Sequence, residues 1–533
     1  MRERARAGRG GAAFLFLLAA LGAAVATTAA RAGETVLRFV PQADLRILDP
    51  IWTSAYITQH HAYMVYDTLF ALDEHLRPQP QMVERWSVSD DQRVYTFTLR
   101  PGLKFHDGLP VLPADCIASL ARWGKRDVLG QKLMARVEAM TPVDDRTFKI
   151  ALKRPFPLIL TALAELNGNP FIMPERLAKT DADKQVTDPI GSGPFKFVKA
   201  EWEPGHKAVY VKNPDYVPRP EKPSWVAGGK VVKVDRVEWI YLPDSATAAA
   251  ALNNGEVDWW ELVPIELLPV FAANKDVVVD RKPDPLGTIA ILRFNHLHPP
   301  FDNPKMRQAL LYAVDQREYM TAVAGDPENW RPCFAFFTCG TPMASDAGAA
   351  PLAGPRDLAK AKALIAEAGY HGEKIVLLDP SDYAIVHAES LVTADLLRRL
   401  GLTVDVATSD WGTLLARRAS KEPVEKGGWT LFHTSVLGTD MLDPAQNSQL
   451  RGNGAGGWFG WPTDAKMEAL REQWLDAPDE AARQRLAAAI QEEAFASVPY
   501  IPLGQFNRPT AYRRALAGVV RAPIPIFWEV AKE

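Results

Sequence analysis

Residues 191–216 place the strongest local constraint on how this chain can fold. They read GSGPFKFVKAEWEPGHKAVYVKNPDY, with two alternating apolar segments set between turn-forming residues. The glycines of GSGP can adopt positive φ and the proline is restricted, so this segment predicts a tight turn. Phe195 and Phe197 then predict a strand, Glu-Pro-Gly a turn, and residues 209–211 the returning strand. The sequence therefore predicts a β-hairpin, for which a structural role without ligand contacts is the simpler interpretation.

The length of the chain predicts more than one domain. At 533 residues it exceeds what a single hydrophobic core normally supports, so two or three domains are expected. Residues 1–32 carry five arginines and one glutamate, which leaves 56 basic and 63 acidic residues in the rest of the chain, a net charge of −7. This mildly acidic balance does not favour binding to nucleic acid or to anionic membranes.

The N-terminus has the three parts of a secretory signal peptide. Four arginines occur in the first nine residues, an apolar run covers residues 12–26, and Ala-Arg-Ala at residues 30–32 is a cleavage signal. The apolar run is too short to cross a bilayer, which takes about 20 residues. No cysteine follows the run until Cys116, so lipid attachment is not expected there. We predict cleavage after Ala32 and a freely diffusing periplasmic protein without a membrane anchor.

The three cysteines fit an oxidising compartment. Cys333 and Cys339 enclose only five residues, and in an exported protein this spacing favours a short-loop disulfide. Zinc needs more ligands than two cysteines supply. Cys116 lies in a predicted helix and is interpreted as a small buried apolar residue.

Several segments together resemble a known family. GSGPF, W-x-P-G and N-P-D-Y follow one another in residues 191–216. This order resembles the signature of the extracytoplasmic solute-binding proteins of peptide/nickel (family 5) ABC importers. Other segments resemble motifs of the same family: YTFTLR and KFHDG within residues 95–108, and RQAL at residues 307–310. The resemblance covers nearly the whole mature chain. It implies an α/β protein with the two-lobe periplasmic-binding-protein fold (type II, cluster C) and an extra subdomain inserted in lobe I.

The resemblance also implies the domain boundaries. Lobe I is expected at residues 33–298 with the inserted subdomain at about 64–186, lobe II at 299–504, and a return to lobe I at 505–533. Within lobe II, helical and strand patterns alternate from Asp357 onward. Such alternation predicts βαβ units and a largely parallel sheet.

The sequence lacks the common signatures of hydrolases and nucleotide-binding enzymes. There is no G-x-S-x-G, H-E-x-x-H or Walker loop, so a secreted hydrolase is disfavoured and neither catalytic residues nor a cofactor are predicted. The histidine pairs at residues 60–61 and at 296 and 298 could hold a transition metal, although surface or polar-core roles are the simpler interpretation. Nickel-importing relatives keep a nickel or metal-chelate ligand as an alternative.

A candidate ligand-binding residue comes from the resemblance. In dipeptide-binding relatives, an aspartate of a D-x-x-D-P loop holds the peptide amine, and residues 440–444 read DMLDP here. We therefore expect Asp440 to bind a ligand ammonium between the lobes; a solvated turn residue is the alternative. Those relatives place an arginine before the long helix of lobe II, and residues 379–383 have none. This departure argues against a strict dipeptide.

Aromatic residues complete the predicted ligand site. Trp411, Trp429, Trp458 and Phe459 occur where the resemblance places the pocket, and Tyr56 is added from the first lobe. Trp stacks on planar or apolar groups, but core packing explains such residues equally well. The implied function is the periplasmic substrate-binding component of an ABC importer. As a monomer, it would capture a short peptide or similar amphipathic solute and deliver it to the permease subunits.

Overall fold

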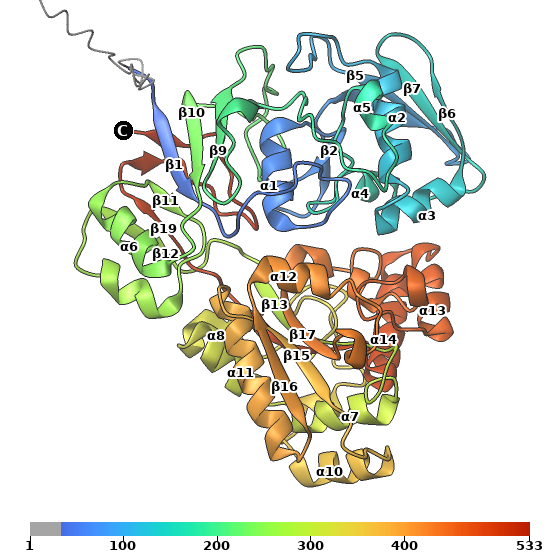
Figure 1. Ribbon diagram of the computed structural model, residues 1–533. Coiled ribbons are helices and arrows are strands. Elements are labelled where there is room, and N and C mark those ends of the chain that lie inside the picture. Colours follow the sequence, from blue (N-terminus) through green and yellow to red (C-terminus); the bar gives the residue numbers. More distant parts are fainter. Residues whose placement is uncertain (1–32) are drawn as a thin grey trace, which may run out of the picture. The chain divides into compact units, whose positions relative to one another are not determined.

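A computed structural model describes residues 33–533, which are organised by three sheets of four or more strands (Figure 1). The predicted signal peptide, residues 1–32, lies outside the described residues. Within the described part, no helix combines the length and apolarity needed to cross a bilayer.

The first sheet has seven strands and is built around β1, which is parallel to both of its neighbours. Alternate residues of β1, Leu37 and Phe39, are fully buried, as expected for a strand covered on one face. In order across the sheet, the strands are β12 (Val277–Asp280), β19 (Thr510–Arg513), β11 (Trp259–Trp260), β1 (Val36–Val40), β10 (Arg236–Ile240), β9 (Lys207–Lys212) and β8 (Phe195–Phe197).

An antiparallel four-stranded sheet lies between β1 and β8 in the sequence, within the span expected for the inserted subdomain. Its strands, in order, are β4 (Val83–Val88), β5 (Val94–Leu99), β7 (Thr147–Leu152) and β6 (Val137–Pro142). Tyr95, Phe97 and Leu99 are buried on one face of β5, as their period-2 spacing predicts. The other elements of this region are α1 (Tyr56–Val65), the β2–β3 pair (Phe70–Leu72, Pro78–Pro80), α2 (Pro113–Trp123), α3 (Val128–Arg136), α4 (Ile159–Ala162) and α5 (Glu175–Ala178).

The predicted hairpin is present as antiparallel β8 and β9. The glycines that precede it are needed for a different reason than predicted, because neither of them is among the residues with positive φ. A Cβ on Gly191 would lie 2.0 Å from the carbonyl oxygen of Val65, and one on Gly193 would lie 2.7 Å from that of Met64. The Gly193 N–H also donates to the Val65 carbonyl at 2.9 Å. The segment therefore packs its backbone against the last turn of α1, where only glycine fits.

The second sheet has six strands and is mixed rather than largely parallel as expected. Only β17, β15 and β16 run parallel, while β13 is antiparallel to both of its neighbours. The order across the sheet is β14 (Trp330–Arg331), β18 (Tyr500–Phe506), β13 (Thr288–Phe294), β17 (Leu431–Leu437), β15 (Ile375–Pro380) and β16 (Val404–Ser409). The expected boundary at residue 298 is too late, because β13 already belongs to the second sheet.

The parallel strands of the second sheet are covered on both faces. In β15, Ile375 and Leu377 join the main core cluster, whereas Val376 and Leu378 join a separate cluster that includes Leu414 of α12 (Trp411–Arg417). Helix α11 (Ala384–Arg399) contributes to the main cluster and runs beside the strands in Figure 1. Strands buried on both faces form continuous apolar runs, which is why IVLL predicted a buried strand.

The remaining helices begin and end at the signals present in the sequence. For α6 (Ser245–Asn254), the Asp244 side chain accepts from the Thr247 N–H, and Gly255 ends the helix in the left-handed conformation. The others are α7 (Pro304–Ala313), α8 (Gln316–Ala324), α9 (Ala350–Ala353), α10 (Leu358–Glu367), α13 (Ala465–Leu475) and α14 (Glu480–Ser497). Cys333 and Cys339 form a disulfide, with their Cα atoms 5.7 Å apart, and Cys116 is a buried free thiol.

Candidate functional site

The candidate site lies where the three parallel strands of the second sheet end. Because parallel strands present their carboxyl ends at one edge, the residues that follow β15, β16 and β17 are brought together there. These residues include Tyr383 before α11, Trp411 at the start of α12, and Asp440 in the 3-10 turn η5 (Gly438–Met441).

Asp440 joins this edge to the first half of the chain. The hydroxyl of Tyr56 and the side-chain amide of Asn167 each donate to its Oδ2 at 2.9 Å, and the Leu437 N–H donates to the Tyr56 hydroxyl at 2.9 Å. Burial raises the pKa of Asp440, and these hydrogen bonds oppose that rise. No Lys, Arg or His of residues 33–533 forms an ion pair with Asp440. The carboxylate is therefore held in place by neutral donors and has no cationic partner.

Further carboxyl groups surround Asp440. Burial and the neighbouring Asp127 raise the pKa of Glu165 well above its ordinary value, and Asp443 and Asp440 add to the effect. Burial also raises the pKa of Asp127 to about 6. Asp127, Asp440 and Asp443 all raise the pKa of Glu165, so the four acidic groups lie close enough to interact, and such a group favours a nearby cation.

Arg508 is the main site residue that the sequence analysis missed. It follows β18, where the chain returns from the second sheet to the first, and its side chain is buried. Its positive charge opposes the burial-driven rise in the pKa of Asp440, of Glu261 (to about 7) and of Asp284 (to about 6). No local motif marks Asn-Arg-Pro as a binding segment, so the sequence carried no signal for it.

These residues form one group, which we call the interlobe polar cluster. Arg508 also lies beside the Tyr383 hydroxyl, and burial is the larger influence on that tyrosine, raising its pKa. The cluster consists of Tyr56, Glu261, Asp284, Tyr383, Asp440 and Arg508. Its members come from both sheets and from the two connections between them.

The histidine pairs were predicted as possible metal ligands. Within residues 33–533, no three or more His, Cys, Asp and Glu side chains are placed to share a metal ion. His60 Nδ1 lies 3.4 Å from Glu261 Oε1, but burial lowers the pKa of His60 to about 3. The imidazole is therefore neutral at physiological pH, and this contact is not an ion pair.

The predicted aromatic residues fall into two places. The Trp411 ring packs edge-on against Tyr383, with the ring centroids 5.0 Å apart, and so borders the interlobe polar cluster. Trp429, Trp458 and Phe459 pack instead with Phe432 and Trp461, and we call these five residues the aromatic cluster.

The residues of the aromatic cluster also contact other parts of the protein. Trp429 is fully buried at the opposite end of β17 from Asp440, and its indole N–H donates to the Ser420 carbonyl. The Arg418 guanidinium lies 4.5 Å from the centre of the Phe459 ring and 5.5 Å from that of Trp458. The chain's own cation thus lies over two of the rings that were expected to contact a ligand, and their role in ligand binding stays a prediction.

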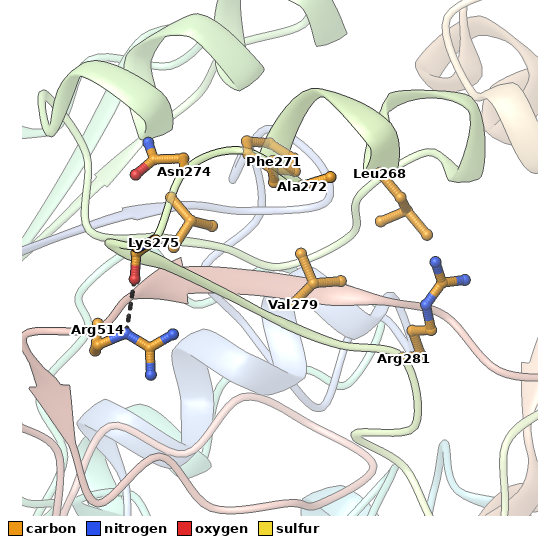
Figure 2. Close-up of a pocket in the computed structure, with 9 residues that line it drawn as sticks. Leu268, Phe271, Ala272, Asn274, Lys275, Val279, Arg281 and Arg514 are labelled. Carbon is orange, nitrogen blue, oxygen red and sulfur yellow. Dashed lines mark hydrogen bonds between the residues drawn. The ribbon is translucent and has the colours of Figure 1, made fainter.

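A pocket of about 600 Å³ lies elsewhere, on the first sheet between β12 and the 3-10 helix η2 (Ile265–Phe271). Figure 2 shows Leu268 and Phe271 on one side of it, with Arg281 and Arg514 at its rim. The Arg514 Nε donates to the Lys275 carbonyl at 2.7 Å. None of the residues that line this pocket belongs to the interlobe polar cluster, so its size does not identify it as the functional site.

Two α/β lobes with charged groups gathered between them define a solute-binding protein. The sequence profile of the bacterial extracellular solute-binding proteins, family 5, matches residues 77–458. The chain belongs to this family, and its role is to bind a substrate for transport.

Individual relatives agree with this assignment. The chain is 41% identical over 509 residues to the probable peptide ABC transporter periplasmic-binding protein y4tO of Sinorhizobium fredii, with 95% of each protein covered. It is 27% identical over 505 residues to the glutathione-binding protein GsiB of Pectobacterium atrosepticum, with 90% of each covered. Its fold is similar to that of the binding protein AgaA of A. tumefaciens R10, solved with agropinic acid, with a TM-score of 0.79 and 24% identity over 93% of this chain and 99% of that one.

Proposed function

We propose that this protein captures a short peptide, or a small solute with the same charged groups, in the periplasm and delivers it as a monomer to the permease of an ABC importer. The observation that carries the proposal is the environment of Asp440. Its carboxylate is oriented by Tyr56 and Asn167, has no cationic partner among the described residues, and lies among other acidic groups. A desolvated ammonium is the group that such a carboxylate binds best.

The contacts of Asp440 also suggest how binding is signalled. Tyr56 belongs to α1 and Asn167 follows α4, whereas Asp440 follows β17 of the second sheet. A solute held here contacts both lobes and so favours the arrangement in which these elements meet. The permease would then recognise that arrangement, and the solute would be released unaltered.

The direct test is isothermal titration calorimetry of residues 33–533 with di- to pentapeptides and with their N-acetylated counterparts. We expect free peptides to bind and N-acetylation to weaken binding by about 100-fold, because an amide cannot replace an ammonium at Asp440. Chromatography after incubation should recover the peptides intact. Equal binding of both forms, or hydrolysis of the peptides, would contradict the proposal.

The nickel-chelate alternative is tested in the same instrument. Nickel(II) with histidine is titrated in the presence and absence of EDTA. Because histidine coordinates nickel through its amine and so offers no free ammonium to Asp440, we expect no heat of binding from either sample. Saturable, EDTA-sensitive binding at micromolar concentration would favour the metal chelate over the peptide.

A further inference from the structure

The loop that the disulfide closes, residues 333–339, lies against the turn that carries Asp440, and we call it the disulfide loop. Thr338 of this loop is fully buried. Its hydroxyl donates to the Gly438 carbonyl at 2.6 Å, and its backbone N–H donates to the Met441 carbonyl at 3.0 Å. These carbonyls belong to the first and last residues of η5, so a single residue of the disulfide loop binds both ends of the turn.

The turn is closely packed on another side as well. The Gly438 N–H donates to the Gly287 carbonyl at 2.8 Å, and a Cβ on Gly438 would lie 2.8 Å from the Cβ of Leu286. Residues 286 and 287 come directly before β13, so the turn is held between the start of that strand and Thr338. Because Asp440 belongs to the turn, its carboxylate can be placed no more accurately than the turn itself.

The disulfide ties Thr338 to an anchored residue. Gln316 of α8 is buried, and its side chain accepts from the Cys333 N–H at 2.7 Å and donates to the Cys333 carbonyl at 2.8 Å. The same side chain donates to the Pro502 carbonyl of β18 at 2.8 Å, which fixes Cys333 to the second sheet. The disulfide joins Cys333 to Cys339, the neighbour of Thr338. The covalent bond therefore limits how far Thr338 can move from the turn.

Building on the proposed function, we propose that Thr338 and the Cys333–Cys339 disulfide are positioning elements of the ligand site, which hold η5 so that Asp440 meets the ammonium of the solute. They act through Asp440 and do not bind the solute themselves. A binding group reaches its full effect only when its support holds it to within about 0.5 Å. The disulfide loop thus contributes to the affinity for the solute and not only to the stability of the fold.

The test compares two threonines that make the same kind of bond. Thr338→Val removes the hydroxyl bond to Gly438. Thr430→Val removes a hydroxyl bond to the Val376 carbonyl, 3.0 Å long, from an equally buried residue at the opposite end of β17 from Asp440. Both variants should lower the melting temperature by similar amounts, because each loses one buried hydrogen bond.

Calorimetry with the free and N-acetylated di- to pentapeptides distinguishes the two threonine variants. We expect Thr338→Val, but not Thr430→Val, to weaken the binding of free peptides by about 10-fold. Binding of the N-acetylated peptides, which present no ammonium to Asp440, should be the same in all three proteins. In the Asp440→Asn background, Thr338→Val should cause no further loss, because the group that it positions has been removed.

A cysteine variant tests the covalent bond. Replacing Cys333 and Cys339 together by alanine should also weaken the binding of free peptides by about 10-fold. Cys116→Ala, which removes a buried free thiol, is the control and should leave the affinity unchanged. If the double variant does not fold, Thr338→Val decides the outcome.

Hydrogen exchange of the ligand-free protein separates a failure of this inference from a failure of the proposed function. We expect residues 438–441 to exchange faster in Thr338→Val than in the unmodified protein or in Thr430→Val. Unchanged exchange in this turn overturns the inference, and so do equal affinities for free peptides in Thr338→Val and Thr430→Val. Faster exchange without binding of any peptide refutes the proposed function and leaves Thr338 as the support of the turn.

Discussion

Beside the aromatic cluster, the buried guanidinium of Arg293 is supplied with hydrogen-bond acceptors by the protein, whereas Arg508 of the interlobe polar cluster forms no ion pair within residues 33–533. Around the aromatic cluster, Arg293 donates to the carbonyls of Phe459, Gln449 and Pro499, and Arg418 lies over aromatic rings. Among residues 33–533, Asp440 and Arg508 of the polar cluster form no ion pair. A buried charge that the protein satisfies itself stabilises the fold, whereas one left without a partner costs stability and is available to a ligand. The two regions should therefore respond to mutation in opposite ways.

The largest expected effect is a loss of folding stability when Arg293 is replaced. Arg293→Met removes a buried guanidinium and leaves the carbonyl oxygens of Phe459 and Gln449 without donors, so we expect a loss of about 4 kcal/mol in the free energy of unfolding. Urea unfolding monitored by tryptophan fluorescence measures it. Lys421→Met, which removes an exposed ammonium 5.3 Å from the Trp461 ring centre, is the control and should cost less than about 1 kcal/mol. Similar losses in the two variants would remove the distinction between the clusters.

On the ligand side, Asp440→Asn should weaken peptide binding by about 100-fold, or about 3 kcal/mol, because it removes the charge that balances an ammonium. The stability of the ligand-free protein should not fall. Asp443→Asn is the matched control from the same loop: Asp443 accepts from the N–H groups of Ala445 and Gln446, so its loss should lower stability more than affinity. Calorimetry and thermal unfolding of both variants separate these outcomes. An Asp440→Asn variant with unaltered affinity would remove Asp440 from the site.

The polar cluster should also make stability depend on pH. Burial raises the pKa of Glu261 from its ordinary 4.5 to about 7, so the folded state retains a proton that the unfolded state loses. The resulting stabilisation, roughly 3 kcal/mol, is present below about pH 4.5 and is lost as the pH rises through 7. Glu261→Gln should flatten this part of the profile, whereas Glu74→Gln, at an exposed position, should not. Parallel profiles for all three proteins from pH 4 to 8 would show that Glu261 does not titrate in this range.

The smallest expected effect concerns ion pairs at a distance from both clusters. Glu472 of α13 accepts from Lys132 and Arg136 of α3, and these contacts also join the two lobes. Because the pairs are partly exposed, each contributes no more than about 1 kcal/mol. Glu472→Gln should therefore weaken peptide binding by only two- to three-fold, and the difference from the unmodified protein should shrink in 0.5 M salt. A loss as large as that of Asp440→Asn would mean that closure, and not direct contact with the ligand, determines affinity.

Much of the local structure follows from the sequence because its signals are local. Asp244 and Gly255 mark the ends of α6, and the alternating residues of β5 bury the face that they predict. Where a prediction was wrong, contacts between segments far apart in the sequence were the reason. Gly191 and Gly193 are needed for contact with the backbone of α1, and β13 joins the second sheet because β17 and β18 pair with it.

The candidate site, too, was predicted from the sequence only in part. Asp440 and Tyr56, which lie far apart in the sequence and were nominated from it, share a hydrogen bond in the structure. Trp429, Trp458 and Phe459 were assigned to the same pocket. In the structure Trp429 is fully buried, whereas Trp458 and Phe459 are partly buried and lie against Arg418. A sequence pattern can predict whether an aromatic residue is buried, but it does not show which side chain covers it.

The sequence by itself determined the family, through motifs whose order is preserved along the chain, and it nominated Asp440 as a ligand-binding carboxylate. Only the tertiary structure decided which cation lies near that carboxylate. Residues 379–383 contain no arginine, yet the guanidinium of Arg508 lies beside Tyr383 because the chain crosses back between the lobes at that point. Electrostatic pairing depends on distance in space, which the fold sets and the order of residues does not.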